Sequence, residues 1–101
     1  MTDLEMTRLC AEAMGYRITD EYDDLGHVEC EQCGDFDPIH DDAQAMALVK
    51  NHYLAFYWRF NIVTEPRWEV CGPEGQKICF SKDLNRAIVE CVAKMQKAQA
   101  A

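Results

Sequence analysis

The sequence predicts an α/β (α+β) fold in which a small antiparallel sheet has helices on both faces, a three-layer α/β/α sandwich. Three segments repeat apolar residues at helical spacing, and short apolar segments between the second and third are separated by turn residues. Hydrophobic residues make up 49% of the 101 residues. A chain this apolar would leave one sheet face poorly covered unless helices packed on both. Its length predicts a single domain, 1–101.

A first helix is expected over residues 2–14. Thr2 and Glu5 form a capping-box pattern, and Gly15 suits the position just past a helix end. Residues 16–19 can form a short strand. Asp, Gly and Pro residues then punctuate the chain, so an acidic irregular segment is predicted over 18–41, with at most a loose hairpin.

The second half of the sequence is predicted to form a helix, three strands and a final helix. Asp41 or Asp42 can cap a helix over 42–57, followed by a strand over 59–64, although alternation of large apolar residues makes the junction ambiguous. Strands over 67–71 and 76–80 flank the turn residues 72–75. Ser81 is the expected cap of the last helix, whose apolar stripe includes Ile88 and Val92.

The net charge of −8 comes from one part of the chain. Ten acidic residues and no Lys or Arg lie between Ile18 and Val49. An acidic chain is repelled by nucleic-acid phosphates and by anionic lipid, so binding to either is not expected. No run of 18 apolar residues is present, and the N-terminus lacks the pattern of a signal peptide, so the host cytoplasm is the expected compartment.

The acidic segment has two interpretations. Charge runs are commonly solvated loops. Alternatively, the carboxylates form a surface that binds a basic partner through charge-assisted hydrogen bonds, in place of phosphates. The candidate partner-binding residues are Asp20, Glu21, Asp23, Asp24, Glu29, Glu31, Asp35 and Asp37.

A C-x-x-C-G turn flanked by two histidines lies inside this segment. His27, Cys30, Cys33 and His40 offer the Cys₂His₂ set that tetrahedral zinc uses, although the spacing is unusual. The alternatives are unliganded thiols with surface histidines, or a redox pair. Zinc is therefore the one candidate cofactor.

The aromatic residues of 53–60 are expected in the core, or else in an apolar patch for a partner or a homodimer. We find no phosphate-binding glycine loop, nucleophile elbow or two-histidine metal helix. A non-enzymatic protein is therefore expected.

Four pieces in order resemble a family of small phage and prophage proteins, the phage ABA-sandwich domain. They are LCAEAMGY at 9–16, DFDPIHDDAQAMALV at 35–49, RWEV at 67–70 and AIVECVA at 87–93. The resemblance implies an α/β/α sandwich and a phage origin, and it implies no catalytic residues. The 27–40 Cys/His cluster and the long aromatic stretch depart from the family pattern.

Small size, acidic charge and the resemblance to phage proteins together predict an inhibitor of a bacterial defence complex, similar to an anti-CRISPR protein. The acidic surface would act as a nucleic-acid mimic in a basic channel, with a CRISPR effector as the expected partner. One alternative is a zinc-stabilised phage accessory module that binds another protein. A second is a binder of a small signalling nucleotide, for which the cations of the C-terminal half are available: Arg59, Arg67, Lys77, Lys82 and Arg86.

Overall fold

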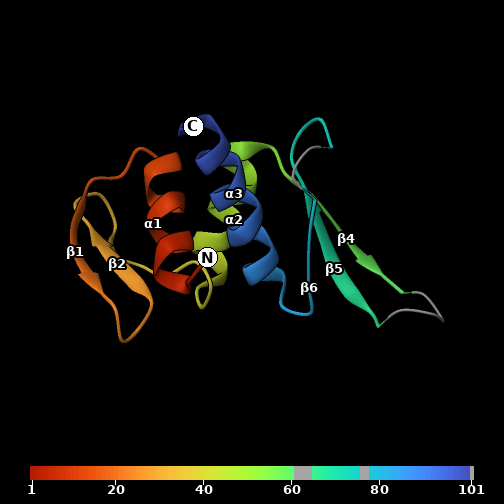
Figure 1. Cartoon of the computed structure of the whole chain (residues 1–101), viewed down its shortest axis with the longest axis horizontal. Helices are drawn as coiled ribbons and strands as arrows, with labels where there is room; N and C mark the ends of the chain where they lie inside the picture. Colours follow the sequence, from red (N-terminus) through yellow and green to blue (C-terminus); the bar gives the residue numbers. More distant parts are fainter. Residues whose placement is uncertain (61–64, 76–77, 101) are drawn as a thin grey trace.

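The computed structural model describes residues 1–60, 65–75 and 78–100 and contains helices and two antiparallel sheets (Figure 1). The helices are α1 (Asp3–Ala13), α2 (Asp42–His52) and α3 (Leu84–Ala100). One sheet has the order β1-β2-β3, from Ile18–Tyr22, His27–Cys30 and Gly34–Phe36. The other has the order β4-β5-β6, from Ala55–Arg59, Arg67–Cys71 and Cys79–Ser81.

The helices lie between the two sheets (Figure 1). Helix α1 packs on β1 and β2, helix α3 packs on β5 and β6, and the two helices pack against each other. The predicted mixed α and β class with small antiparallel sheets is confirmed. The layer order differs from the α/β/α arrangement, because a second sheet takes the place of a helical layer. Each sheet consequently leaves one face in solvent.

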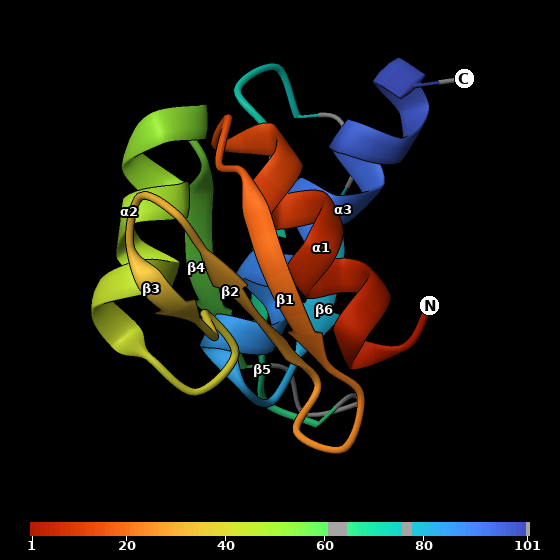
Figure 2. The ribbon, with the colours of Figure 1, turned by 90° about the vertical axis from the view of Figure 1, so that its left-hand side faces the viewer.

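The first sheet corrects the prediction of an irregular segment over 18–41. Strands β1, β2 and β3 pair antiparallel in sequence order. The side chains of Val28, Cys30 and Phe36 are buried toward the helices, whereas the intervening residues face outward. Figure 2 looks onto this outer face, with the helices behind it. The alternation of Val28 and Cys30 with Glu29 and Glu31 is the sequence pattern that could have indicated a strand here.

The second sheet begins earlier than expected. Helix α2 ends at His52, because Tyr53 adopts the left-handed conformation with φ 54°. Strand β4 occupies Ala55–Arg59 in place of the predicted helix end and the predicted strand over 59–64, of which 61–64 lie outside the described residues. Strand β5 matches the prediction. Strand β6 covers Cys79–Ser81, and residues 76 and 77 of the predicted strand over 76–80 lie outside the described residues.

Local signals explain the helix starts. The Thr2 side chain accepts a hydrogen bond from the Glu5 amide at 3.1 Å, and Asp41 accepts one from the Gln44 amide at 3.0 Å. At the start of α3, the Asp83 side chain accepts a hydrogen bond from the Asn85 amide, and the Ser81 hydroxyl oxygen accepts one from the Asp83 amide. The cap therefore lies two residues beyond the expected Ser81.

One hydrophobic cluster joins the helices to the inner faces of both sheets. Cys10 on α1 and Cys91 on α3 are fully buried and act as small apolar side chains. The guanidinium of Arg86 on α3 holds Asp3 of α1 through two hydrogen bonds, of 2.6 and 3.2 Å. Among the described helices, none is both long and apolar enough to cross a membrane.

Candidate functional site

The candidate site is the outer face of the β1-β2-β3 sheet, which we name the acidic face. Asp20, Glu29 and Asp35 lie directly opposite one another on neighbouring strands. Glu29 points away from the helices because its neighbours Val28 and Cys30 point toward them. Since directly paired residues share a face, Asp20 and Asp35 point outward as well. The three side chains form a carboxylate row across the sheet.

An aromatic pair borders the carboxylate row. The Tyr22 hydroxyl donates a hydrogen bond to Glu29 Oε2 at 2.8 Å, and the Tyr22 and His27 rings lie 5.1 Å apart. The Glu29 hydrogen bond, with the surrounding carboxylates, raises the pKa of Tyr22 to about 12. Tyr22 was not singled out from the sequence, although its position two residues after Asp20 on a strand places both on one face.

Asp23 and Asp24 lie in the turn between β1 and β2, at one end of the acidic face. They line a pocket of about 390 Å³ together with Thr2 and Asp3 at the start of α1. These two carboxylates extend the negative surface beyond the carboxylate row.

The other predicted acidic residues are not part of the carboxylate row. Glu21 points inward and pairs with Arg8 of α1, with Nη2 and Oε1 2.6 Å apart. Glu31 pairs with Arg17 at 3.6 Å. Arg8 and Arg17 lie before the acidic window, the stretch from Ile18 to Val49 that holds ten acidic residues and no Lys or Arg. The charges inside that window therefore could not reveal these two ion pairs.

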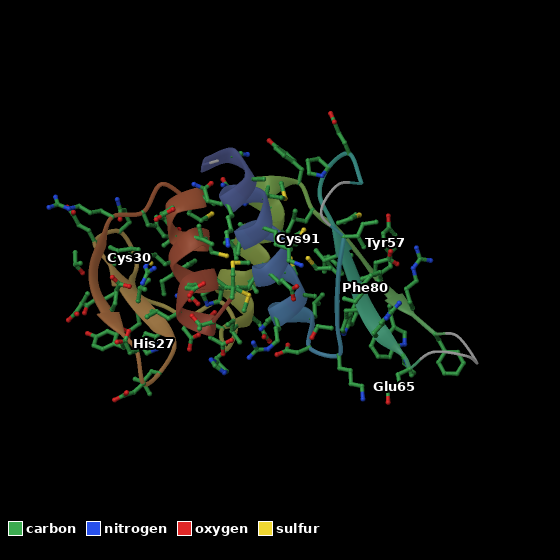
Figure 3. All side chains as sticks on the ribbon, viewed as in Figure 1. His27, Cys30, Tyr57, Glu65, Phe80 and Cys91 are labelled. Carbon is green, nitrogen blue, oxygen red and sulfur yellow. The ribbon has the colours of Figure 1, made fainter. Side chains whose placement is uncertain are left out.

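The structure brings together only part of the predicted metal set. Cys30 and Cys33 interact at the turn from β2 to β3, where Gly34 has φ +72°. Burial, with the neighbouring Cys33 thiol, raises the pKa of Cys30 to about 11. His27 lies on the opposite face of β2 from Cys30. Figure 3 labels both residues on the first sheet.

His40 completes the predicted metal set, and its ring contacts the Asp37 carboxylate at 3.0 Å. Within residues 1–60, 65–75 and 78–100, no three His, Cys, Asp or Glu side chains are grouped closely enough to hold a metal ion. Zinc stays a prediction, which elemental analysis of the purified protein checks. A zinc content below roughly a tenth of an equivalent, with a melting curve unaltered by chelator, would eliminate it.

The cations considered for a nucleotide do not converge. Arg59 pairs with Glu69, and Arg86 pairs with Asp3. Arg67 instead covers a ring, with its guanidinium carbon 4.0 Å from the Phe80 centroid. The remaining two cations are Lys82, which pairs with Glu65, and Lys77, which lies outside the described residues. A nucleotide would therefore compete with existing ion pairs.

Comparison of the chain with protein-family models, with curated proteins and with solved structures gave no match.

Proposed function

We propose that this chain is a non-enzymatic protein-binding module whose acidic face occupies a basic, nucleic-acid-binding surface of a partner. The carboxylate row carries the proposal, because its three side chains stand on neighbouring strands, and neighbouring strands lie roughly 4.8 Å apart. Such a row offers Arg and Lys side chains a line of anionic acceptors, as a phosphate backbone does.

The carboxylate row has a cost for folding. Like charges directly opposite each other on neighbouring strands destabilise a sheet. Among the described residues, no Lys or Arg lies within ion-pair distance of Asp20, Glu29 or Asp35. A row of like charges with no described Lys or Arg in ion-pair contact is suited to a cationic partner.

The specific partner that we propose is a bacterial defence complex, with a CRISPR effector as the leading case. Effectors of this kind hold nucleic acid in positively charged channels. The phage origin that we expect from the sequence is part of the same proposal. By this proposal the protein competes with nucleic acid and leaves the chemistry of the effector unchanged.

The test uses a panel of purified CRISPR effector complexes with their guide RNAs. We expect this protein to displace labelled target DNA from at least one complex in a gel-shift competition. Raising the salt concentration should weaken the competition, because the contact is electrostatic. Absence of binding to every complex in the panel would reject the defence-complex assignment.

A matched pair of variants tests the acidic face. Asp20→Asn with Asp35→Asn removes two charges from the carboxylate row, and Glu5→Gln with Glu12→Gln removes two from α1, whose side chains are also exposed. Both variants change the net charge from −8 to −6. The first should weaken competition at least roughly tenfold, the second much less. Equal losses would show that net charge, and not this face, determines binding.

A further inference from the structure

Exposed apolar side chains concentrate around the β4-β5-β6 sheet. Of the eight large hydrophobic residues exposed in the described part of the chain, six belong to this sheet or its flanks. They are Tyr53, Tyr57, Trp58, Phe60, Ile78 and Phe80. Figure 3 labels Tyr57 and Phe80 on this sheet, at the opposite end of the molecule from the acidic face. Strand pairing places Tyr57 and Phe80 on one face of the sheet and Trp58 on the other, so the exposed apolar side chains of both faces meet along β4.

Strand β4 is the exposed edge of this sheet. It pairs with β5 on one side, and no described strand pairs with its other side (Figure 1). Its sequence, Ala-Phe-Tyr-Trp-Arg, contains no proline and a single charge, so it lacks the devices that normally block edge pairing. The other edge, β6, is only three residues long. The unpaired amides and carbonyls of β4 therefore form a template for one more strand.

We propose that a second copy of this chain binds here, pairing β4 with β4 in antiparallel orientation to form a continuous sheet of six strands. A two-fold axis normal to the sheet keeps inner faces on the same side. Directly opposite residues share a face, so the axis passes midway between one residue and the same residue of the second copy. This symmetry leaves a small number of registers to compare.

Charge and apolar contact select the register centred on Trp58. Trp58 then faces Trp58 of the second copy, and Phe56 faces Phe60. Arg59 faces Tyr57, an arrangement that extends the contact already present within one chain, where the Arg59 guanidinium carbon lies 5.0 Å from the Tyr57 centroid. An axis at Arg59 would oppose two like charges. An axis at Tyr57 would place Phe60, which is 73% exposed, opposite Leu54, a buried residue that precedes β4 and cannot cover it.

The dimer leaves the acidic face free. The two sheets lie on opposite sides of the helical layer, so pairing through β4 does not cover the first sheet (Figure 1). Each dimer then carries two acidic faces, which allows bivalent contact with a partner that has two basic sites.

Sedimentation velocity of the full chain between roughly 1 and 500 µM tests the proposal, a range that covers weak association. We expect a concentration-dependent change from 11.6 kDa to twice that mass. Hydrogen exchange at the β4 amides should slow at the higher concentrations, because pairing protects edge amides. A monomer throughout the range, or a dimer with unchanged β4 exchange, would overturn strand pairing.

Charge variants test the register. Trp58→Lys and Trp58→Glu should each reduce dimerisation at least tenfold, and a mixture of the two should restore it through opposite charges at the axis. Phe60→Lys, at a more exposed position, gives the same loss with less risk to folding. The matched control is Ile78→Lys on the flank of β6, which should leave the dimer intact. Loss in the control equal to that in Phe60→Lys would overturn the proposal.

Discussion

Neutralising the outer members of the carboxylate row should stabilise the folded protein. The variant is Asp20→Asn with Asp35→Asn, which removes one like-charge pair on each side of Glu29. The substitutions preserve shape, and an asparagine oxygen can still accept the hydrogen bond that Asp20 Oδ1 receives from the Glu21 amide at 2.9 Å. The Tyr22 bond to Glu29 is untouched.

The magnitude follows from the strand geometry. Carboxylates about 6 Å apart repel by about 0.7 kcal/mol in a water-like dielectric. Screening leaves about 0.6 kcal/mol per pair at 10 mM salt, about 0.3 at 0.15 M and about 0.1 at 1 M. Two pairs therefore give a gain of about 1.2 kcal/mol at 10 mM salt. For a chain of this size the gain corresponds to a rise in Tm of roughly 5–10 °C.

Thermal and urea unfolding, followed by circular dichroism across that salt range, measure this gain. The control is Glu5→Gln with Glu12→Gln, which changes the net charge equally. Glu5 lies in the first turn of α1 and Glu12 near its end, so their interactions with the helix dipole oppose each other, and the control also loses the attraction of both side chains to Arg8. A gain in the carboxylate-row variant no larger than in the control, or a gain insensitive to salt, would contradict like-charge repulsion across the strands.

Other perturbations probe the frame of the same molecule. The Arg86 hydrogen bonds hold the pKa of Asp3 below its ordinary value, so they stabilise the fold at neutral pH and lose this effect as the pH falls below about 4. Arg86→Met should therefore cost about 0.5–1 kcal/mol at pH 7, a small loss because both side chains are partly exposed, and nothing in stronger acid. Urea unfolding measures both values. Glu29→Gln should lower the pKa of Tyr22 from about 12 toward 10, as an ultraviolet titration reports, and an unchanged value would contradict the role assigned to their hydrogen bond. Leu48→Ala in the buried face of α2 should destabilise the fold by about 2–5 kcal/mol, and a loss below about 1 would mean that this face is loosely packed.

Elements with strong local signals were predictable. The capping residues Thr2 and Asp41 define helix starts through their own side chains, and the turn over 72–75 separates β5 from β6. The buried stripe of α3, with Ile88 and Val92, follows directly from helical spacing. These features need no contact with distant parts of the chain.

The candidate site was predictable in composition and not in arrangement. The acidic window identified Asp20, Glu29 and Asp35, but only strand pairing places them opposite one another. The same pairing sends Glu21 inward to Arg8, a residue outside the window. Alternation assigns a face only once a strand is known to exist, and the turn residues of this segment concealed its strands.

By itself, the sequence determined the mixed class, the concentration of negative charge and most helix boundaries, because each depends on residues close together along the chain. Only the tertiary structure decided the layer order, the carboxylate row and the unpaired edge of β4. Each of these depends on which segments lie side by side. The physical reason is that a strand is stabilised by its neighbours across the sheet, whereas a helix satisfies its backbone hydrogen bonds within itself.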